Sequence, residues 1–168
     1  CRRLRDCTRD MRLRLRVGCP AAPLPSGRSL HFSSLAAAVA ASRPGDTVEL
    51  LGGGGWGPCG ALDAPVTVPH ALRLLGGGGG TPLQAPGRGC GALRFCLPRG
   101  SAALLHRVHV ECELAPAVEN CGPGSLRLEQ CRVAVRPHPL DHLGTPLLAG
   151  GPTTVSGTVL AGGSAAGA

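Results

Sequence analysis

The amino-acid sequence contains no isoleucine, no tyrosine and no lysine, and its 168 residues include one tryptophan and two phenylalanines. So few aromatic rings leave almost no surface on which nucleic-acid bases could stack, although the formal net charge is +7. The apolar residues are mainly Ala, Leu and Val, while glycine, proline and arginine are in excess. This pattern is typical of a GC-rich coding sequence, so the arginines are weak evidence for a nucleic-acid partner, and we expect none.

The nine cysteines show no CxxC spacing, which zinc sites and redox motifs commonly use. Their number is odd, the sequence shows no secretory hydrophobic segment, and several cysteines stand in strand-like apolar runs. We therefore expect reduced thiols, with Cys112 and Cys131 buried and the face of Cys96 left open. A reduced protein is expected in the cytoplasm or the nucleus, and we expect no membrane partner.

The composition along the chain divides it into four segments. Residues 1–17 are a basic arm with seven arginines, which begins with helical spacing and ends in the two-residue alternation LRLRLRV. Residues 18–29 hold three prolines and two glycines and are predicted to be a linker. Residues 30–160 form the folded unit, and residues 161–168 are expected to be a flexible tail.

The folded unit is predicted to begin with one short helix and to continue in short strands. Ser33 or Ser34 can cap an alanine-rich helix that ends before Pro44 and Gly45. Strands are expected over residues 47–51, 66–68, 72–75, 93–96 and 104–112, with strand-like pieces near residues 147, 155 and 159. The glycine runs 52–55 and 76–80 are interpreted as turns between strands, since they lack the residues of a phosphate-binding loop.

A 23-residue repeat is the strongest internal signal. Five apolar positions recur at this offset: Ala103, Leu105, Val108, Val110 and Cys112 return as Leu126, Leu128, Cys131, Val133 and Val135. Both runs alternate, shift by one residue and alternate again, which is typical of a strand, a sharp corner and a second strand. Stacked coils of this kind cover each other's apolar faces, so the sequence predicts an all-β, right-handed parallel β-helix of about five coils with an N-terminal capping helix.

The segments LHFSSLAAAVAASRPGDTVELLGGGGW, APVTVPHALRLLGGG, LLHRVHVEC and SLRLEQCRVAV resemble the CASH-type β-helices of carbohydrate-binding proteins and sugar hydrolases, and in particular those of F-box proteins. The likeness covers roughly residues 29–136, and its "PGD" turn is present although GGGGW is longer than the usual Gly-aromatic turn. CRRLRDCTRDMRLRLRV is similar to the tail of an F-box, but Leu4 stands where tryptophan is common. The resemblance implies a ubiquitin-ligase adaptor that would bind Skp1 only if a complete F-box lies upstream.

Carboxylates are too sparse for the usual polysaccharide-cleaving sites of pectin lyase-like β-helices, which cluster them for Ca²⁺ binding or acid and base catalysis. Glu111 and Glu113 are the nearest candidates, because they lie two residues apart on one strand face, about 7 Å from each other. A charged outer strand face is ordinary, so we expect a structural role for this pair and no catalytic residue.

Histidines give no convincing metal site. His106 and His109 are expected to point to opposite faces of a strand, and HPLDH at residues 138–142 lacks a third ligand at a known spacing. We therefore expect no metal and no cofactor.

The residues predicted to lie outward form a candidate partner-binding face: Arg107, His109, Glu111, Glu113, Arg127 and Glu129. The leading hypothesis is a non-catalytic protein-recognition module, with this face selecting substrates for an SCF ubiquitin ligase if the F-box resemblance holds. The alternative is a carbohydrate-binding or carbohydrate-active β-helix, which rests on fold analogy.

Overall fold

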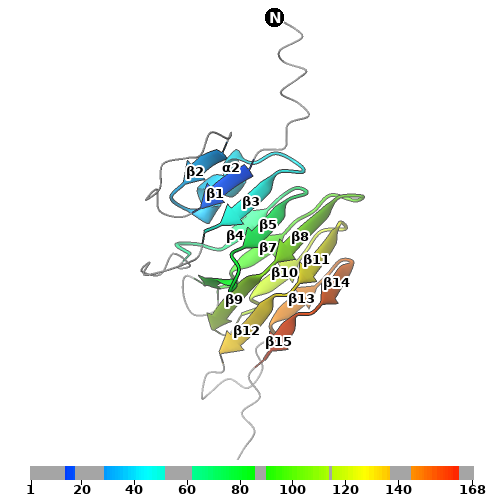
Figure 1. Ribbon diagram of the computed structural model, residues 1–168. Helices are drawn as coiled ribbons and strands as arrows, with labels where there is room; N and C mark the ends of the chain where they lie inside the picture. The colour runs from blue at the N-terminus through cyan, green and yellow to red at the C-terminus, as the bar shows by residue number, and fades with distance from the viewer. Residues whose placement is uncertain are drawn as a thin grey trace, which may run out of the picture.

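The computed structural model describes residues 14–17, 29–51, 62–85, 90–113, 115–136 and 145–162. Within these residues the chain is a parallel β-helix: short strands from successive coils stack into three parallel sheets, with one helix at the end of the stack (Figure 1). The predicted fold class is therefore confirmed.

Three sheets run along the stack, and each takes one strand from every complete coil. Sheet A contains, in spatial order, β14 (Thr153–Ser156), β11 (Ser125–Glu129), β8 (Ala102–His106), β5 (Arg73–Gly76), β3 (Thr47–Leu50), β1 (Arg14–Val17) and β2 (Ser29–Phe32). Sheet B contains β15 (Val159–Ala161), β12 (Arg132–Arg136), β9 (Val108–Glu113) and β6 (Thr81–Gln84). Sheet C contains β13 (Leu147–Ala149), β10 (Val118–Asn120), β7 (Leu93–Phe95) and β4 (Val66–Val68).

The chain visits the sheets in the order A, B, C, so that β5–β6–β7, β8–β9–β10 and β11–β12–β13 are complete coils. Strands β3 and β4 belong to a first, partial coil, and β1 and β2 extend sheet A beyond β3; β14 and β15 begin a last, partial coil (Figure 1). The described residues thus form three complete coils between two partial ones, against the expected total of about five.

The 23-residue repeat is the register of the stack. Leu105 pairs with Leu128 in sheet A, and Val110 pairs with Val133 in sheet B. Because β9 and β12 stay in this register, Val108 lies beside Cys131, one position before the paired strands. The predicted stacking is confirmed.

The break in the alternation is a corner. Arg107 separates β8 from β9 with a φ of 54°, and Gln130 does the same between β11 and β12 with a φ of 51°. Residues other than glycine rarely adopt this left-handed backbone conformation. Here a single such residue turns the chain sharply from one sheet into the next. Inward and outward positions are exchanged there, which is the shift of one residue seen in the repeat.

The core occupies the space between the three sheets. Strand residues alternate between buried and exposed, as in β9, where Val108, Val110 and Cys112 are buried and the residues between them are partly exposed. Leucine and valine fill most of the interior, and Phe95 is the largest fully buried side chain among the described residues. Each coil alone would leave this inner face in water, so burial depends on the coil above and the coil below.

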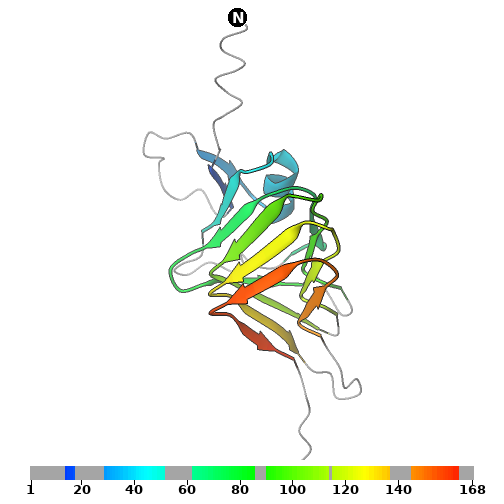
Figure 2. The same ribbon diagram turned by 90° about the vertical axis from the view of Figure 1, so that its right-hand side faces the viewer.

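Helix α2 (Leu35–Ala41) covers the beginning of the stack (Figure 2). The Ser34 hydroxyl accepts a hydrogen bond from the Ala37 amide, so Ser34, rather than Ser33, is the N-cap. Leu35, Ala38 and Val39 are buried on the inner side of the helix. The predicted capping helix is confirmed.

The N-terminal segment differs from its prediction at two points. Ser29, assigned to the linker, is the first residue of β2. Residues 14–17, assigned to the basic arm, form β1 and pair with both β2 and β3. Their two-residue alternation suits a strand, and Val17 is buried in the core. The rest of the arm, the linker up to residue 28 and the tail from residue 163 lie outside the described residues.

The opposite end of the stack is more open. Val155 of β14 and Leu160 of β15 are in register with the fully buried Leu128 and Val133, yet they are 40% and 44% exposed. Among the described residues, no further strand pairs with β13, β14 or β15. The last coil is therefore covered on one side only (Figure 2).

Candidate functional site

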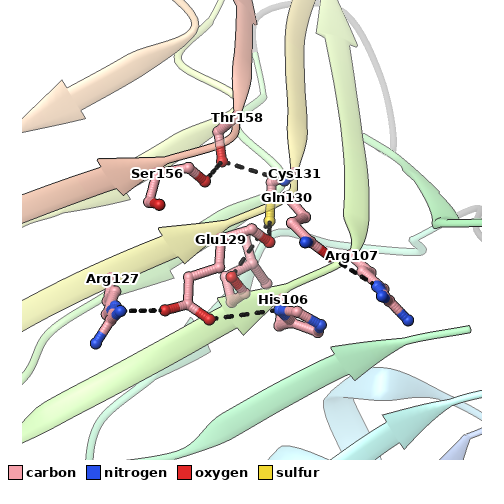
Figure 3. A network of polar contacts seen from close by, with 9 residues as sticks. His106, Arg107, Arg127, Glu129, Gln130, Cys131, Ser156 and Thr158 are labelled. Carbon is pink, nitrogen blue, oxygen red and sulfur yellow. Dashed lines mark hydrogen bonds and ion pairs between the residues drawn. The ribbon is translucent and has the colours of Figure 1, made fainter.

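The outward residues at the end of β8 and β11 form a small polar cluster (Figure 3). Arg127 and Glu129 alternate with buried leucines on β11, and Arg127 Nη2 lies 2.5 Å from Glu129 Oε1. The other Glu129 oxygen lies 3.5 Å from Nδ1 of His106, its register partner on β8. Glu129 thus joins two neighbouring coils on the outer face of sheet A.

The corner beside this cluster is tied across the same two coils. Arg107 Nε donates a hydrogen bond of 2.8 Å to Gln130 Oε1, so the two left-handed corner residues bind each other (Figure 3). The Arg107 backbone carbonyl accepts from the Thr81 amide of the preceding coil at 3.1 Å. The corner is therefore fixed both by its backbone and by its side chain.

An ion pair connects β9 and β12 on the outer face of sheet B. Arg136 Nε and Nη2 donate to the two Glu111 carboxylate oxygens at 2.8 and 2.9 Å, which is a bidentate arrangement. These hydrogen bonds hold the pKa of Glu111 below its ordinary value, although partial burial opposes the shift. Glu111 therefore stays ionised under mildly acidic conditions.

A shallow groove of about 290 Å³ lies next to this ion pair. Its lining residues come from three coils: Pro82 of β6, His109, Val110 and Glu111 of β9, and Arg132 and Ala134 of β12. His109 and Arg132 are register partners, so an imidazole and a guanidinium occupy neighbouring positions on the adjacent strands β9 and β12. The His109 ring also packs over Gly80, where a Cβ atom would come within 2.3 Å of Nε2.

The six residues predicted as a partner-binding face are all at least partly exposed, but they occupy two faces. His109, Glu111 and Glu113 lie outward on sheet B, and Arg127 and Glu129 lie outward on sheet A. Arg107 stands at the corner where the two faces meet. We call this set the corner surface; its role in binding stays a prediction.

One geometric prediction about the histidines is wrong. His106 and His109 do not point to opposite faces of one strand, because the corner at Arg107 places them on β8 and β9 of different sheets. Both are outward and half-buried. The left-handed residue between them was visible in the sequence only as the shift in the repeat.

Sequence reasoning missed the partners of the predicted residues. These partners are His106, Gln130, Arg132 and Arg136. The 23-residue offset contained the signal for the first three, because it places His106 opposite Glu129, Arg107 opposite Gln130 and His109 opposite Arg132. It does not find the Glu111–Arg136 pair, which is diagonal: Arg136 is in register with Glu113.

In the described part of the chain, no three His, Cys, Asp or Glu side chains are grouped closely enough to hold a metal ion. The candidate HPLDH segment lies outside that part. The described helix is seven residues long, and none of the described residues form a helix that is long and apolar enough to cross a membrane.

Comparison with protein-family models, with curated proteins and with solved structures finds no match to this chain in any of the three.

Proposed function

We propose that this chain is a non-catalytic protein-recognition module whose binding site is the corner surface. The observation that carries the proposal is that the register of the coils holds charged, partly exposed side chains of both signs on two adjoining faces, beside a groove. Binding sites gain affinity when their side chains are already held in place, because less conformational entropy is lost on association. Cross-coil contacts of Arg107, Glu111 and Glu129 hold these side chains in that way.

The ion pair of Glu111 supports recognition more than catalysis. A general acid in a glycoside-cleaving enzyme needs a raised pKa, so that it carries a proton near neutral pH. The bidentate contact with Arg136 lowers the pKa of Glu111 instead. A fixed, ionised carboxylate is suited to binding a cationic or hydrogen-bond-donating side chain of a partner.

We further propose that the partner is a substrate of an SCF ubiquitin ligase, with the β-helix as the substrate-binding part of an F-box adaptor. This part of the proposal rests on the resemblance of residues 1–17 and 29–136 to β-helix-bearing F-box proteins. Skp1 binding would require a complete F-box upstream of these residues.

The recognition proposal is tested by comparing partners captured from cells by the wild-type chain and by three variants. Glu111→Gln with Glu113→Gln, and separately Arg107→Glu, alter the corner surface, whereas Glu119→Gln alters an ion-paired carboxylate on sheet C. We expect one protein to bind the wild-type chain and Glu119→Gln equally, and to bind the two corner variants at least tenfold more weakly when both components are purified. Each corner variant removes a largely exposed contact, so its free energy of unfolding should fall by less than about 1 kcal/mol, and it should remain fully folded at the temperature of the binding assay.

Two results would overturn these proposals. Cleavage of polygalacturonate by the wild-type chain that disappears in the Glu111→Gln, Glu113→Gln variant would replace recognition with catalysis. Failure of purified Skp1 to bind the natural full-length protein would remove the ligase assignment alone, because the binding assay above does not depend on it.

A further inference from the structure

Two exposed cysteines on neighbouring coils lie next to each other where strands β7 and β10 of sheet C end. Cys96 directly follows β7 and Cys121 directly follows β10. Their preceding residues, Phe95 and Asn120, are register partners, and the Cys121 amide donates to the Phe95 carbonyl at 2.8 Å, so the ladder continues to the two cysteines. Neighbouring parallel strands are about 4.8 Å apart, which lies within the Cα separation of roughly 4.4 to 6.8 Å that a disulfide spans.

Both thiols point away from the core. Phe95 and Leu97 flank Cys96 and are buried, as Asn120 and Gly122 are on either side of Cys121, so the alternation directs both cysteines outward. Both are exposed, and both are free thiols. They therefore differ from Cys112 and Cys131, whose side chains are enclosed in the core.

The surroundings of the two thiols are not equivalent. Cys121 Sγ donates a weak hydrogen bond to Glu119 Oε2 at 3.5 Å, and the same oxygen lies 2.7 Å from Arg94 Nε. Partial desolvation and the Glu119 carboxylate raise the pKa of Cys121, and Arg94 opposes this only weakly. Cys121 is thus held as a thiol, beside a carboxylate that can accept its proton.

We propose that Cys96 and Cys121 form a redox-active pair that closes a disulfide between adjacent coils on reaction with hydrogen peroxide. In the first step the Cys96 thiolate attacks one peroxide oxygen, the O–O bond breaks, and the hydroxide that leaves takes up a proton to become water. Cys96 is now a sulfenic acid. In the second step Cys121 attacks the Cys96 sulfur while its proton passes to Glu119, the S–O bond breaks, and the hydroxide that leaves takes a proton to give a second water. Two thiols are oxidised by two electrons, and one peroxide is reduced to two waters.

The disulfide would fasten the first and second complete coils to each other. Contacts between coils supply most of the burial in a stack of this kind, so a covalent link across one interface opposes its separation. This effect is independent of the proposed recognition function, since sheet C does not carry the corner surface.

The experiment uses the full chain, treated with one equivalent of hydrogen peroxide, alkylated and digested with trypsin without reduction. Cleavage after Arg94 and Arg99 releases residues 95–99, in which Cys96 is the only cysteine. We expect this peptide to be joined to the peptide of residues 108–127, with the loss of two hydrogens, and to be released by a reducing agent. The chain should also unfold at a higher denaturant concentration after oxidation than before.

Matched variants identify the sulfur atoms. The peptide of residues 108–127 holds both Cys112 and Cys121, so the link must persist in Cys112→Ala and disappear in Cys121→Ser. In Cys121→Ser, Cys96 should stop at a sulfenic acid that a dimedone probe labels. A link that persists in Cys121→Ser, or a wild-type chain whose Cys96 remains a free thiol or is oxidised without any link, overturns the proposal.

Discussion

Adjacent residues of one strand experience opposite environments in this protein, and β9 shows it most clearly. Val110 is 1% exposed between the coils that contain Leu83 and Val133, its register partners. His109 points the other way, is half-buried against Gly80 and borders the groove. The same substitution should therefore have different consequences at these two positions.

Replacing Val110 with Asp should lower the free energy of unfolding by about 3 kcal/mol or more, because an unpaired carboxylate would be buried between two coils. His109→Asp should cost less than about 1 kcal/mol, since its side chain reaches solvent. Urea denaturation of the two variants measures both values. Similar losses at the two positions would contradict the assignment of inward and outward faces.

The Glu111–Arg136 pair predicts a small dependence of stability on pH. Glu111 faces Arg136 and, farther away, Arg132, while Glu113 also acts on Arg136. The pKa of Glu111 is lower in the folded state than in the unfolded state. Its contribution to the free energy of unfolding is therefore complete above the unfolded-state pKa of about 4.3, and it is lost as the pH falls through the lower folded-state pKa.

Arg136→Gln should therefore reduce the free energy of unfolding near pH 7 and have less effect at pH values below the folded-state pKa of Glu111. The loss should be less than about 1 kcal/mol, because both side chains are substantially exposed. Denaturation at a series of pH values measures it, with Arg73→Gln on sheet A as the control. A loss that is the same at every pH would show that Arg136 acts through packing alone.

At the scale of single elements, position in the stack should matter more than residue type. Leu128 of β11 lies between two coils and is fully buried, whereas Leu160 of β15 belongs to the last coil and is 44% exposed. The volume left by a deleted side chain is costly when neighbours on both sides cannot collapse into it. Replacing each of the two leucines with alanine therefore compares the same change between two coils and at the last coil.

Leu128→Ala should destabilise the protein by more than about 2 kcal/mol, and Leu160→Ala by less than about 1 kcal/mol. Urea denaturation of each variant against the wild type gives the difference. Comparable losses would mean that the last coil is packed as tightly as the interior ones.

The elements that sequence reasoning found are those in which the repeat is regular. Strands β8, β9, β11 and β12 share one period, so their register and both corners could be predicted. Strand β6 was missed because Pro82 interrupts its pattern; among the described residues β6 is the outermost strand of sheet B, a position that tolerates proline. Strand β10 was missed because its second buried position is the polar Asn120, which leaves Val118 as its one apolar residue, whereas β4 and β7 have an apolar residue at each end.

The candidate site was predictable in part for the same reason. Outward positions follow from the alternation, which placed the six residues of the corner surface at least partly in solvent. Which of these positions bind one another depends on side-chain length and on diagonal reach, as in the Glu111–Arg136 pair. The repeat in the sequence predicts the strand position and the face of a side chain. It does not predict the rotamer, which decides which neighbouring side chain it contacts.

At the scale of the whole molecule, the stack is quasi-one-dimensional, because each coil contacts only its neighbours. One end is covered by α2, and the other is the partial coil of β14 and β15. Local unfolding should therefore begin at the last coil and proceed toward α2. The thiols of each coil should become accessible to reagents only after the coil that covers it has opened. Two buried thiols report on this order.

Cys131 lies directly beneath the last coil: its amide donates to Thr158 Oγ1 at 3.1 Å, and its carbonyl accepts from the Val159 amide at 2.9 Å. Cys112 belongs to the preceding coil, and its register partner is Val135 of β12, in the coil that contains Cys131. Burial raises the pKa of both thiols, so each should react with an alkylating agent only after local opening.

Weakening the last coil should accelerate labelling of Cys131 much more than labelling of Cys112. Val155→Asp places a charge at an inward position of that coil, and a loss of about 1 kcal/mol there would raise its opening roughly fivefold. Val159→Asp is the matched control, because Val159 belongs to the same coil but is in register with the outward Arg132 and is 59% exposed. Alkylation under native conditions, followed by mass spectrometry of the cysteine-containing peptides, measures both rates. Equal acceleration at Cys131 and Cys112 would show that the coils open together as one cooperative unit, and not in sequence from the open end.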